Sequence, residues 1–253
     1  MSWVEWVLLL VAGVGGGLTG SIAGLASLVS YPALLAAGLP PVTANVTNTV
    51  ALVFNGVGSV SASRPELTGQ GRRLARLAVA ALLGGATGTV LLLITPAGGF
   101  ERIVPFLIAG ASVAILVQRP PRELAAEGAR GSHGSGWALA VGVYVIAIYG
   151  GYFGAAAGVL MLAMFLLATG TTVPRGNAAK NVLLLVANLV AAVGYALFAD
   201  VAWVAMLPLA IGFFLGGRLG PRVVRRVDAT WLRRVIALLG LGLAVKLGID
   251  AFG

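Results

Sequence analysis

The sequence TANVTNTVALVFN, residues 43–55, places three asparagines in an otherwise apolar segment. The sequence GNAAKNVLLLVAN, residues 176–188, repeats this pattern 133 residues later. Each segment carries two asparagines seven residues apart: Asn48 and Asn55 in the first, Asn181 and Asn188 in the second. Because seven residues are about two turns of an α-helix, both segments predict a helix with a polar stripe along one face.

The composition around these segments is that of an integral membrane protein. Hydrophobic residues make up 59% of the 253 residues, charged residues only 10%, and the mean hydropathy is +0.99. Apolar runs of about 20 residues between short polar breaks predict a bundle of membrane-spanning α-helices. The chain has no cysteine, and its single histidine, His133, lies in a glycine-rich stretch, so we expect no metal site and no cofactor.

The two halves of the chain share matched residues. Gly20 and Gly24 match Gly154 and Gly158 at an offset of 134, and Pro41, Asn48 and Asn55 match Pro174, Asn181 and Asn188 at 133. A polar, basic stretch separates the halves and is the only long break in hydrophobicity. We therefore divide the chain into an N-terminal membrane repeat (1–118), a linker (119–136) and a C-terminal membrane repeat (137–253).

The arginines predict how the two repeats are oriented. Four of them, Arg64, Arg72, Arg73 and Arg76, follow the first asparagine segment, whereas the corresponding loop of the second repeat, residues 198–203, has none. At the next loop the bias reverses, with six arginines between residues 218 and 234. Since basic loops stay in the cytoplasm, the repeats should have opposite orientations, the linker 119–136 should be cytoplasmic and both termini outside. The positive-inside rule also explains the net charge of +9 better than nucleic-acid binding does.

The predicted loops leave two stretches, residues 3–38 and 137–170, that must each begin and end on one side of the membrane. Both are too long for a single span, so we expect hairpins of two short segments that turn near residues 13–20 and 149–158. The predicted fold is an all-α polytopic membrane protein with two inverted-topology repeats. Each repeat consists of a glycine-rich helical hairpin plus three spans, giving about eight to ten membrane segments.

Polar residues in the apolar interior are the candidates for binding a substrate. Amides, hydroxyls and one lysine without a well-placed acid suit an anion, and helix ends broken at depth offer N–H groups that attract one. The candidate residues are Ser30, Tyr31, Asn45, Asn48, Asn55, Asn177, Lys180, Asn181 and Asn188, with the hairpin glycines Gly20, Gly24, Gly154 and Gly158. In the alternative interpretation, the asparagines join helices by hydrogen bonds, Lys180 reaches the interface and the small residues allow close packing.

The sequence GLTGSIAGLASLVSYPALLAAGLPP (17–41), followed by ANVTNTVALVFNGVGS (44–59), resembles the TauE/SafE sulfite exporter family. The resemblance extends through the diverged second copy and covers essentially the whole chain. It implies a permease of the bacterial inner membrane for sulfite, organosulfonates or related small anions.

Together, the residues and the resemblance predict a secondary transporter, an exporter of a small sulfur-containing anion by alternating access, and not an enzyme. Its expected partners are the small anion and the lipid bilayer, with no nucleic acid; a homo-oligomer is left open. A passive anion channel is one alternative. A membrane enzyme acting on lipid phosphate is another, but it would need a cluster of acids, bases or metal ligands that the sequence lacks.

Overall fold

The computed structural model describes residues 1–131, 136–224 and 230–252, and helices are the only regular elements in these ranges. The helices are α1 (Trp3–Ala23), α2 (Ala26–Ala36), α3 (Pro41–Ala62), α4 (Arg64–Leu67), α5 (Gly71–Ile94), α6 (Ala97–Val117), α7 (Pro121–Arg130), α8 (Gly136–Tyr152), α9 (Ala157–Thr169), α10 (Val173–Phe198), α11 (Trp203–Val224) and α12 (Thr230–Phe252). His133 and the rest of 132–135, together with Arg225 and Arg226, lie outside the described residues.

Six of these helices, α1, α5, α6, α10, α11 and α12, are long and apolar enough to cross a membrane. Helix α3 has 22 residues but carries the first asparagine stripe. Helices α2 and α9 have 11 and 13 residues, or about 17 and 20 Å at 1.5 Å per residue, which is less than the ~30 Å hydrocarbon core. The all-α membrane fold is therefore confirmed, with α2 and α9 as half-length segments.

The first hairpin turns at a different place from the one predicted. Helix α1 continues through the glycines of residues 13–20 and ends only at Gly24, whose φ is +78°. The glycines serve helix packing instead, because a Cβ on Gly13 would lie 2.5 Å from the carbonyl oxygen of Leu209 in α11. The second hairpin turns between α8 and α9, within the predicted range 149–158.

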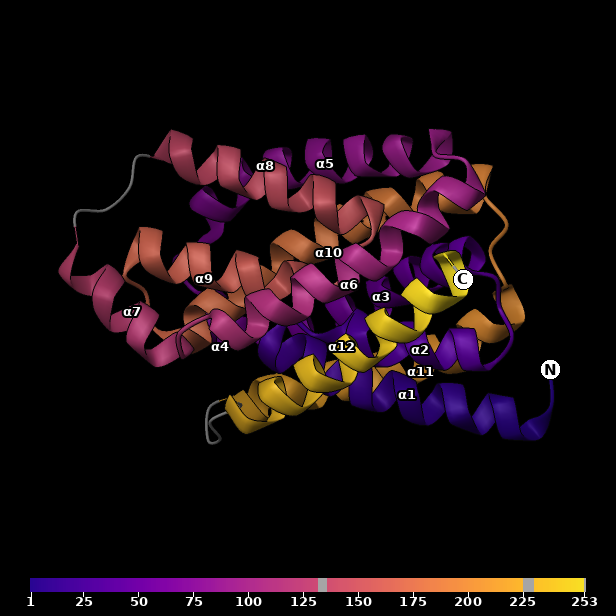
Figure 1. Cartoon of the computed structure of the whole chain (residues 1–253). Helices are drawn as coiled ribbons and strands as arrows, with labels where there is room; N and C mark the ends of the chain where they lie inside the picture. Colours follow the sequence, from indigo (N-terminus) through magenta and orange to yellow (C-terminus); the bar gives the residue numbers. More distant parts are fainter. Residues whose placement is uncertain (132–135, 225–229, 253) are drawn as a thin grey trace.

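Packing interleaves the two halves of the chain. The first hairpin helix of each half packs along a helix of the other half: α1 along α11, and α8 along α5. The two asparagine helices, α3 and α10, pack on each other, and so do α6 and α12 (Figure 1). Glycines permit both hairpin contacts, since a Cβ on Gly84 of α5 would lie 2.4 Å from the carbonyl oxygen of Tyr144 in α8.

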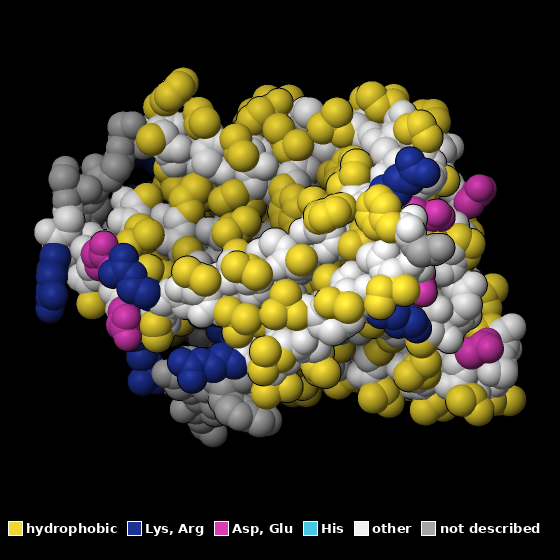
Figure 2. Space-filling view, viewed as in Figure 1, with side chains coloured by type: hydrophobic (Ala, Val, Ile, Leu, Met, Phe, Trp, Pro, Cys, Tyr) yellow, Lys and Arg dark blue, Asp and Glu magenta, His cyan; other side chains and the backbone are white. Residues whose placement is uncertain are grey.

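The two ends of the bundle differ in character. In Figure 1 the N- and C-termini lie at one end, and α4 and α7 lie at the other. Figure 2 shows a broad hydrophobic band over the visible face, with several Lys and Arg side chains at the end that carries α7 and others toward the opposite end. Most basic side chains of this view lie at the end of α7, and the assignment of that end to the cytoplasm stays a prediction.

Cysteine labelling tests that assignment directly because the natural chain has no cysteine. Thr68 is exposed between α4 and α5 at the basic end. Gly98 is exposed near the start of α6, with no atom within 4 Å of the position that a Cβ would occupy. We expect a membrane-impermeant thiol reagent to label Gly98→Cys in intact cells and Thr68→Cys only after permeabilisation. Labelling of Thr68→Cys alone in intact cells would reverse the predicted orientation.

Candidate functional site

The two hairpins meet backbone to backbone in the interior of the protein. A Cβ on Gly24 would lie 2.3 Å from the carbonyl carbon of Gly158, and a Cβ on Gly158 would lie 2.5 Å from the Cα of Gly24. Neither position has room for a side chain. Gly24 also has φ +78°, a left-handed conformation that favours glycine. The contact therefore requires glycine on both sides.

The half-length helices α2 and α9 both begin at this contact. Their N-cap residues, Leu25 and Ala156, provide no side-chain hydrogen bond to the first turn. The first N–H groups of a helix have no partner within the helix and carry partial positive charge. Two helix N-termini without a side-chain cap thus begin at this contact, although the backbone N–H of Ala157 donates to the carbonyl oxygen of Gly154 at 3.2 Å. Helix N-termini favour negative charge.

The backbone conformation pairs Gly24 with Gly154, and not with Gly158 as the sequence match predicts. Gly24 and Gly154 share φ +78°, and they are 130 residues apart rather than 134. Gly158 lies one residue inside α9. The second turn is longer because Ala155 and Ala156 separate Gly154 from α9, and Ala156 itself has φ +58°.

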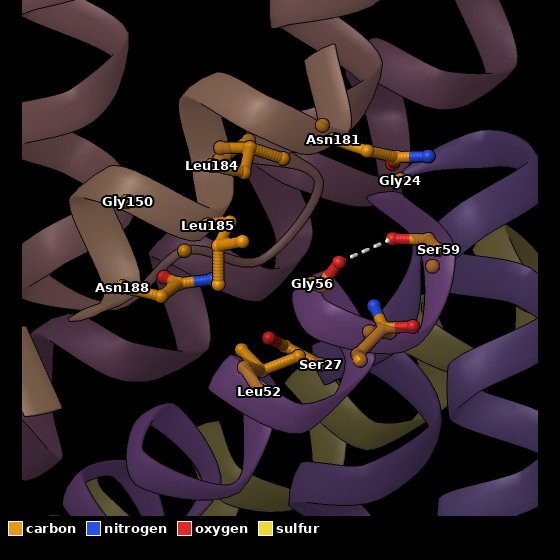
Figure 3. A pocket seen from close by; sticks show the side chains of 16 residues that line it. Gly24, Ser27, Leu52, Gly56, Ser59, Gly150, Asn181, Leu184, Leu185 and Asn188 are labelled. Atoms are coloured by element: carbon orange, nitrogen blue, oxygen red, sulfur yellow. Dashed lines mark hydrogen bonds between the residues drawn. The ribbon is translucent and has the colours of Figure 1, made fainter. Parts of the chain in front are cut away.

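A cavity of about 40 Å³ lies beside this junction, between α3 and α10 (Figure 3). On this measure one water needs roughly 10–15 Å³, so the cavity has room for a small polar group. Its lining residues are Gly20, Gly24, Ala26, Ser27, Leu52, Asn55, Gly56, Ser59, Gly150, Gly154, Ala157, Gly158, Asn181, Leu184, Leu185 and Asn188. The lining contains no charged side chain. It includes all four predicted hairpin glycines and three of the predicted asparagines.

Two of the lining amides have polar atoms without a hydrogen-bond partner among the described residues. The Nδ2 of Asn181 and the Oδ1 of Asn55 are both buried and unpaired, with side chains 5% and 9% exposed. Leaving a buried polar atom unpaired costs about 1–3 kcal/mol. Such atoms beside a cavity are available to a polar ligand.

Other predicted site residues lie outside the cavity and hold the hairpins instead. The Nδ2 of Asn45 in α3 donates to the carbonyl oxygen of Tyr152, the last residue of α8, at 2.9 Å. The Nδ2 of Asn177 in α10 donates to the carbonyl oxygen of Ser21, near the end of α1, at 2.7 Å. Each asparagine helix therefore caps the hairpin helix of the other half.

Lys180 also binds the end of α1. Its side chain is fully buried, and its Nζ lies 2.9 Å from the carbonyl oxygen of Gly20 and 3.4 Å from that of Ser21. A cation at a helix C-terminus interacts favourably with the helix dipole. Lys180 does not line the cavity. It is adjacent in sequence to Asn181 and binds Gly20, and both of these residues line the cavity.

Three further predicted residues form a separate polar contact between α2 and α3. The hydroxyl of Ser30 donates to the Oδ1 of Asn48 at 2.6 Å, and the Nδ2 of Asn48 donates to the hydroxyl of Ser27 at 3.1 Å. Tyr31 is buried against Phe153, edge to face, and its hydroxyl lies 3.4 Å from the carbonyl oxygen of Pro41. Only Ser27 of this group reaches the cavity.

The sequence patterns did not predict several cavity residues, among them Ser27, Gly150 and the leucines Leu52, Leu184 and Leu185. Gly150 could have been found, because it precedes Gly154 by four residues as Gly20 precedes Gly24. Leucines in an apolar helix give no comparable signal. Within the described ranges no three His, Cys, Asp or Glu side chains lie close enough to hold a metal ion.

Removal of a hairpin cap should destabilise the protein. Asn45→Ala leaves the carbonyl oxygen of Tyr152 without its side-chain donor, so we expect a loss of about 1–3 kcal/mol in unfolding free energy. Ser61→Ala is the matched control in α3, since the Ser61 hydroxyl bonds only to Gly58 in its own helix. Thermal unfolding in detergent checks this; equal melting temperatures for both variants would contradict the capping role.

Comparison with known proteins identifies the family of this chain. The family model of the sulfite exporter TauE/SafE matches residues 9–247. The chain is 28% identical over 251 residues to the probable membrane transporter protein YfcA of Escherichia coli K12, covering 98% of this chain and 90% of that protein. It is 26% identical over 244 residues to the probable membrane transporter protein ORF9 of a Sinorhizobium species, covering 96% and 92%. No solved structure matches the chain. Because the family model spans nearly all of the sequence, the chain belongs to the TauE/SafE family of membrane transporters.

Proposed function

We propose that this protein is a secondary transporter that exports a small sulfur-containing anion, such as sulfite or an organosulfonate, by alternating access. The observation that carries the proposal is the cavity beside which the short helices α2 and α9 begin and which the unpaired Nδ2 donor of Asn181 adjoins. The family membership supports transport, and the chemistry of the cavity supports an anion. Asn55, Asn181 and Asn188 would bind the anion oxygens through their Nδ2 donors.

The balance of charge at the junction explains how Lys180 contributes. Two helix N-termini and two helix C-termini meet there, with partial charges of roughly +0.5 and −0.5 each, so their sum is close to zero. The ammonium group of Lys180 changes this balance to about +1. A monovalent anion in the cavity would neutralise it, which is favourable in an interior of low dielectric constant.

Alternating access draws support from the pairing of cavity residues between the two halves. Gly20 and Gly150, Gly24 and Gly154, and Asn55 and Asn188 are equivalent pairs, and all six residues line the cavity. A site built from equivalent residues of inverted repeats can open to either side by rocking one repeat against the other. With the basic end in the cytoplasm, outward movement of an anion would be downhill by roughly 2.3 kcal/mol per charge per 100 mV.

The proposal predicts which polar residues matter for the anion. Asn181→Ala and Lys180→Met should each weaken sulfite binding by about tenfold to a hundredfold, since a hydrogen bond or contact with a charged group contributes about 1.5–3 kcal/mol. Sulfite-dependent thermal stabilisation of the purified protein measures this. Asn45→Ala is the control, because Asn45 lies outside the cavity and should lower the melting temperature while keeping the sulfite response. Equal sulfite responses in wild type and both cavity variants would refute the assigned roles.

Flux measurements separate a carrier from a passive channel. In proteoliposomes, a carrier should show saturable sulfite uptake that is accelerated by unlabelled sulfite on the opposite side of the membrane. A channel would show neither saturation at low millimolar sulfite nor counter-transport. Flux without saturation and without counter-transport would show that the protein conducts the anion passively and would refute alternating access.

A further inference from the structure

The two asparagine helices share a four-residue motif that brings a leucine to the cavity beside each asparagine. The motif reads LVFN at residues 52–55 and LVAN at residues 185–188. Residues three apart in a helix lie on the same face, so each leucine projects one turn from its asparagine. Leu52, Asn55, Leu185 and Asn188 all line the cavity.

The second of these leucines fills the space between the two helices. A Cβ on Gly56 would lie 2.7 Å from the Cδ1 and 2.8 Å from the Cβ of Leu185. Gly56 in α3 therefore leaves room for Leu185 from α10 where the helices cross. Figure 3 shows Leu184, Leu185 and Leu52 as the apolar part of a lining that also presents Asn181 and Asn188.

We propose that Leu52 and Leu185 are a size filter that limits the substrate to a sulfur oxyanion with no substituent or a short carbon substituent. This inference rests on the proposed function, because it concerns the same cavity. The volume of about 40 Å³ accommodates a small head group and little more. The amides would bind the three oxygens of an SO₃ group, and the leucines would face the fourth position on sulfur.

The chemistry of that fourth position decides which anions fit. In sulfite it holds a lone pair, and in an alkanesulfonate it holds carbon; both can lie against an apolar wall. In sulfate it holds a fourth charged oxygen, which would lose its hydration against leucine without a compensating hydrogen bond. The filter therefore predicts discrimination against sulfate and against long alkanesulfonates.

A series of anions tests the filter. Thermal stabilisation of the purified protein is measured with sulfite, sulfate and the methane-, ethane-, propane- and butanesulfonates. We expect wild type to bind sulfite and methanesulfonate at least tenfold more tightly than sulfate or butanesulfonate. Leu185→Ala and Leu52→Ala should shift the optimum to longer chains, with binding improving by about fourfold for each methylene that becomes buried.

Leu183→Ala is the matched control on the same helix. Leu183 is fully buried in the same core cluster as Leu74 and Ala147 and does not line the cavity. Its truncation should lower the melting temperature but leave the order of anion preference unchanged. The milder Leu185→Val keeps the test available if Leu185→Ala does not fold, and it should shift the preference by one carbon.

The contact with Gly56 supplies an independent test. Gly56→Ala should weaken binding of every anion by at least tenfold, because the added methyl displaces Leu185. Gly56→Ala combined with Leu185→Gly, which removes the Cβ of residue 185 as well as its Cδ1, should restore sulfite binding to within about threefold of wild type. The filter is overturned if the leucine variants keep the chain-length preference of wild type, or if the double variant does not regain sulfite binding. Either result leaves the proposal of anion transport intact. Absence of stabilisation by any anion in wild type overturns both proposals.

Discussion

The structure depends on providing hydrogen-bond partners for backbone groups where helices break inside a membrane. Helix α1 ends at Gly24 and α8 ends at Tyr152, so carbonyl groups are exposed at a depth where no bulk water can bind them. Side chains from the opposite half supply the donors. Asn177 and Lys180 bind the end of α1, Asn45 binds the end of α8, and the hydroxyl of Tyr195 donates to Gly151 in α8. The N–H groups at the starts of α2 and α9 receive no such side-chain cap and lie beside the cavity instead.

The asparagines of the two stripes either cap a helix end or line the cavity, except Asn48, which bonds to Ser27 and Ser30 in α2. The first asparagine of each stripe, Asn45 or Asn177, has its Nδ2 committed to a helix end in the other half. The asparagines further along, Asn55, Asn181 and Asn188, line the cavity. Capping residues and cavity-lining residues thus lie on the same two helices.

Sequence reasoning succeeded where a property is local or periodic. Hydropathy predicted an all-α membrane protein, which the structure confirms, whereas the orientation predicted from the arginines stays a prediction. It failed for the turn of the first hairpin, because the glycines of 13–20 look like a helix break but serve the contact with α11. The partners of Lys180 could not be predicted either, since they lie about 160 residues away in sequence. Contacts of that kind depend on how the two halves interleave, which no single helix encodes.

The presence of a lysine in only one half follows from the same electrostatics. The position equivalent to Lys180 in the first half is Thr47, at an offset of 133, and its hydroxyl accepts a hydrogen bond from the backbone N–H of Ala202 at 3.0 Å. A second buried ammonium would raise the net charge of the junction to about +2 in an interior of low dielectric constant, at a large desolvation penalty. In the proposed transporter, one protonated lysine would supply a single positive charge, which matches a monovalent anion. The departure from symmetry at this position would then make an otherwise balanced set of helix ends favour negative charge.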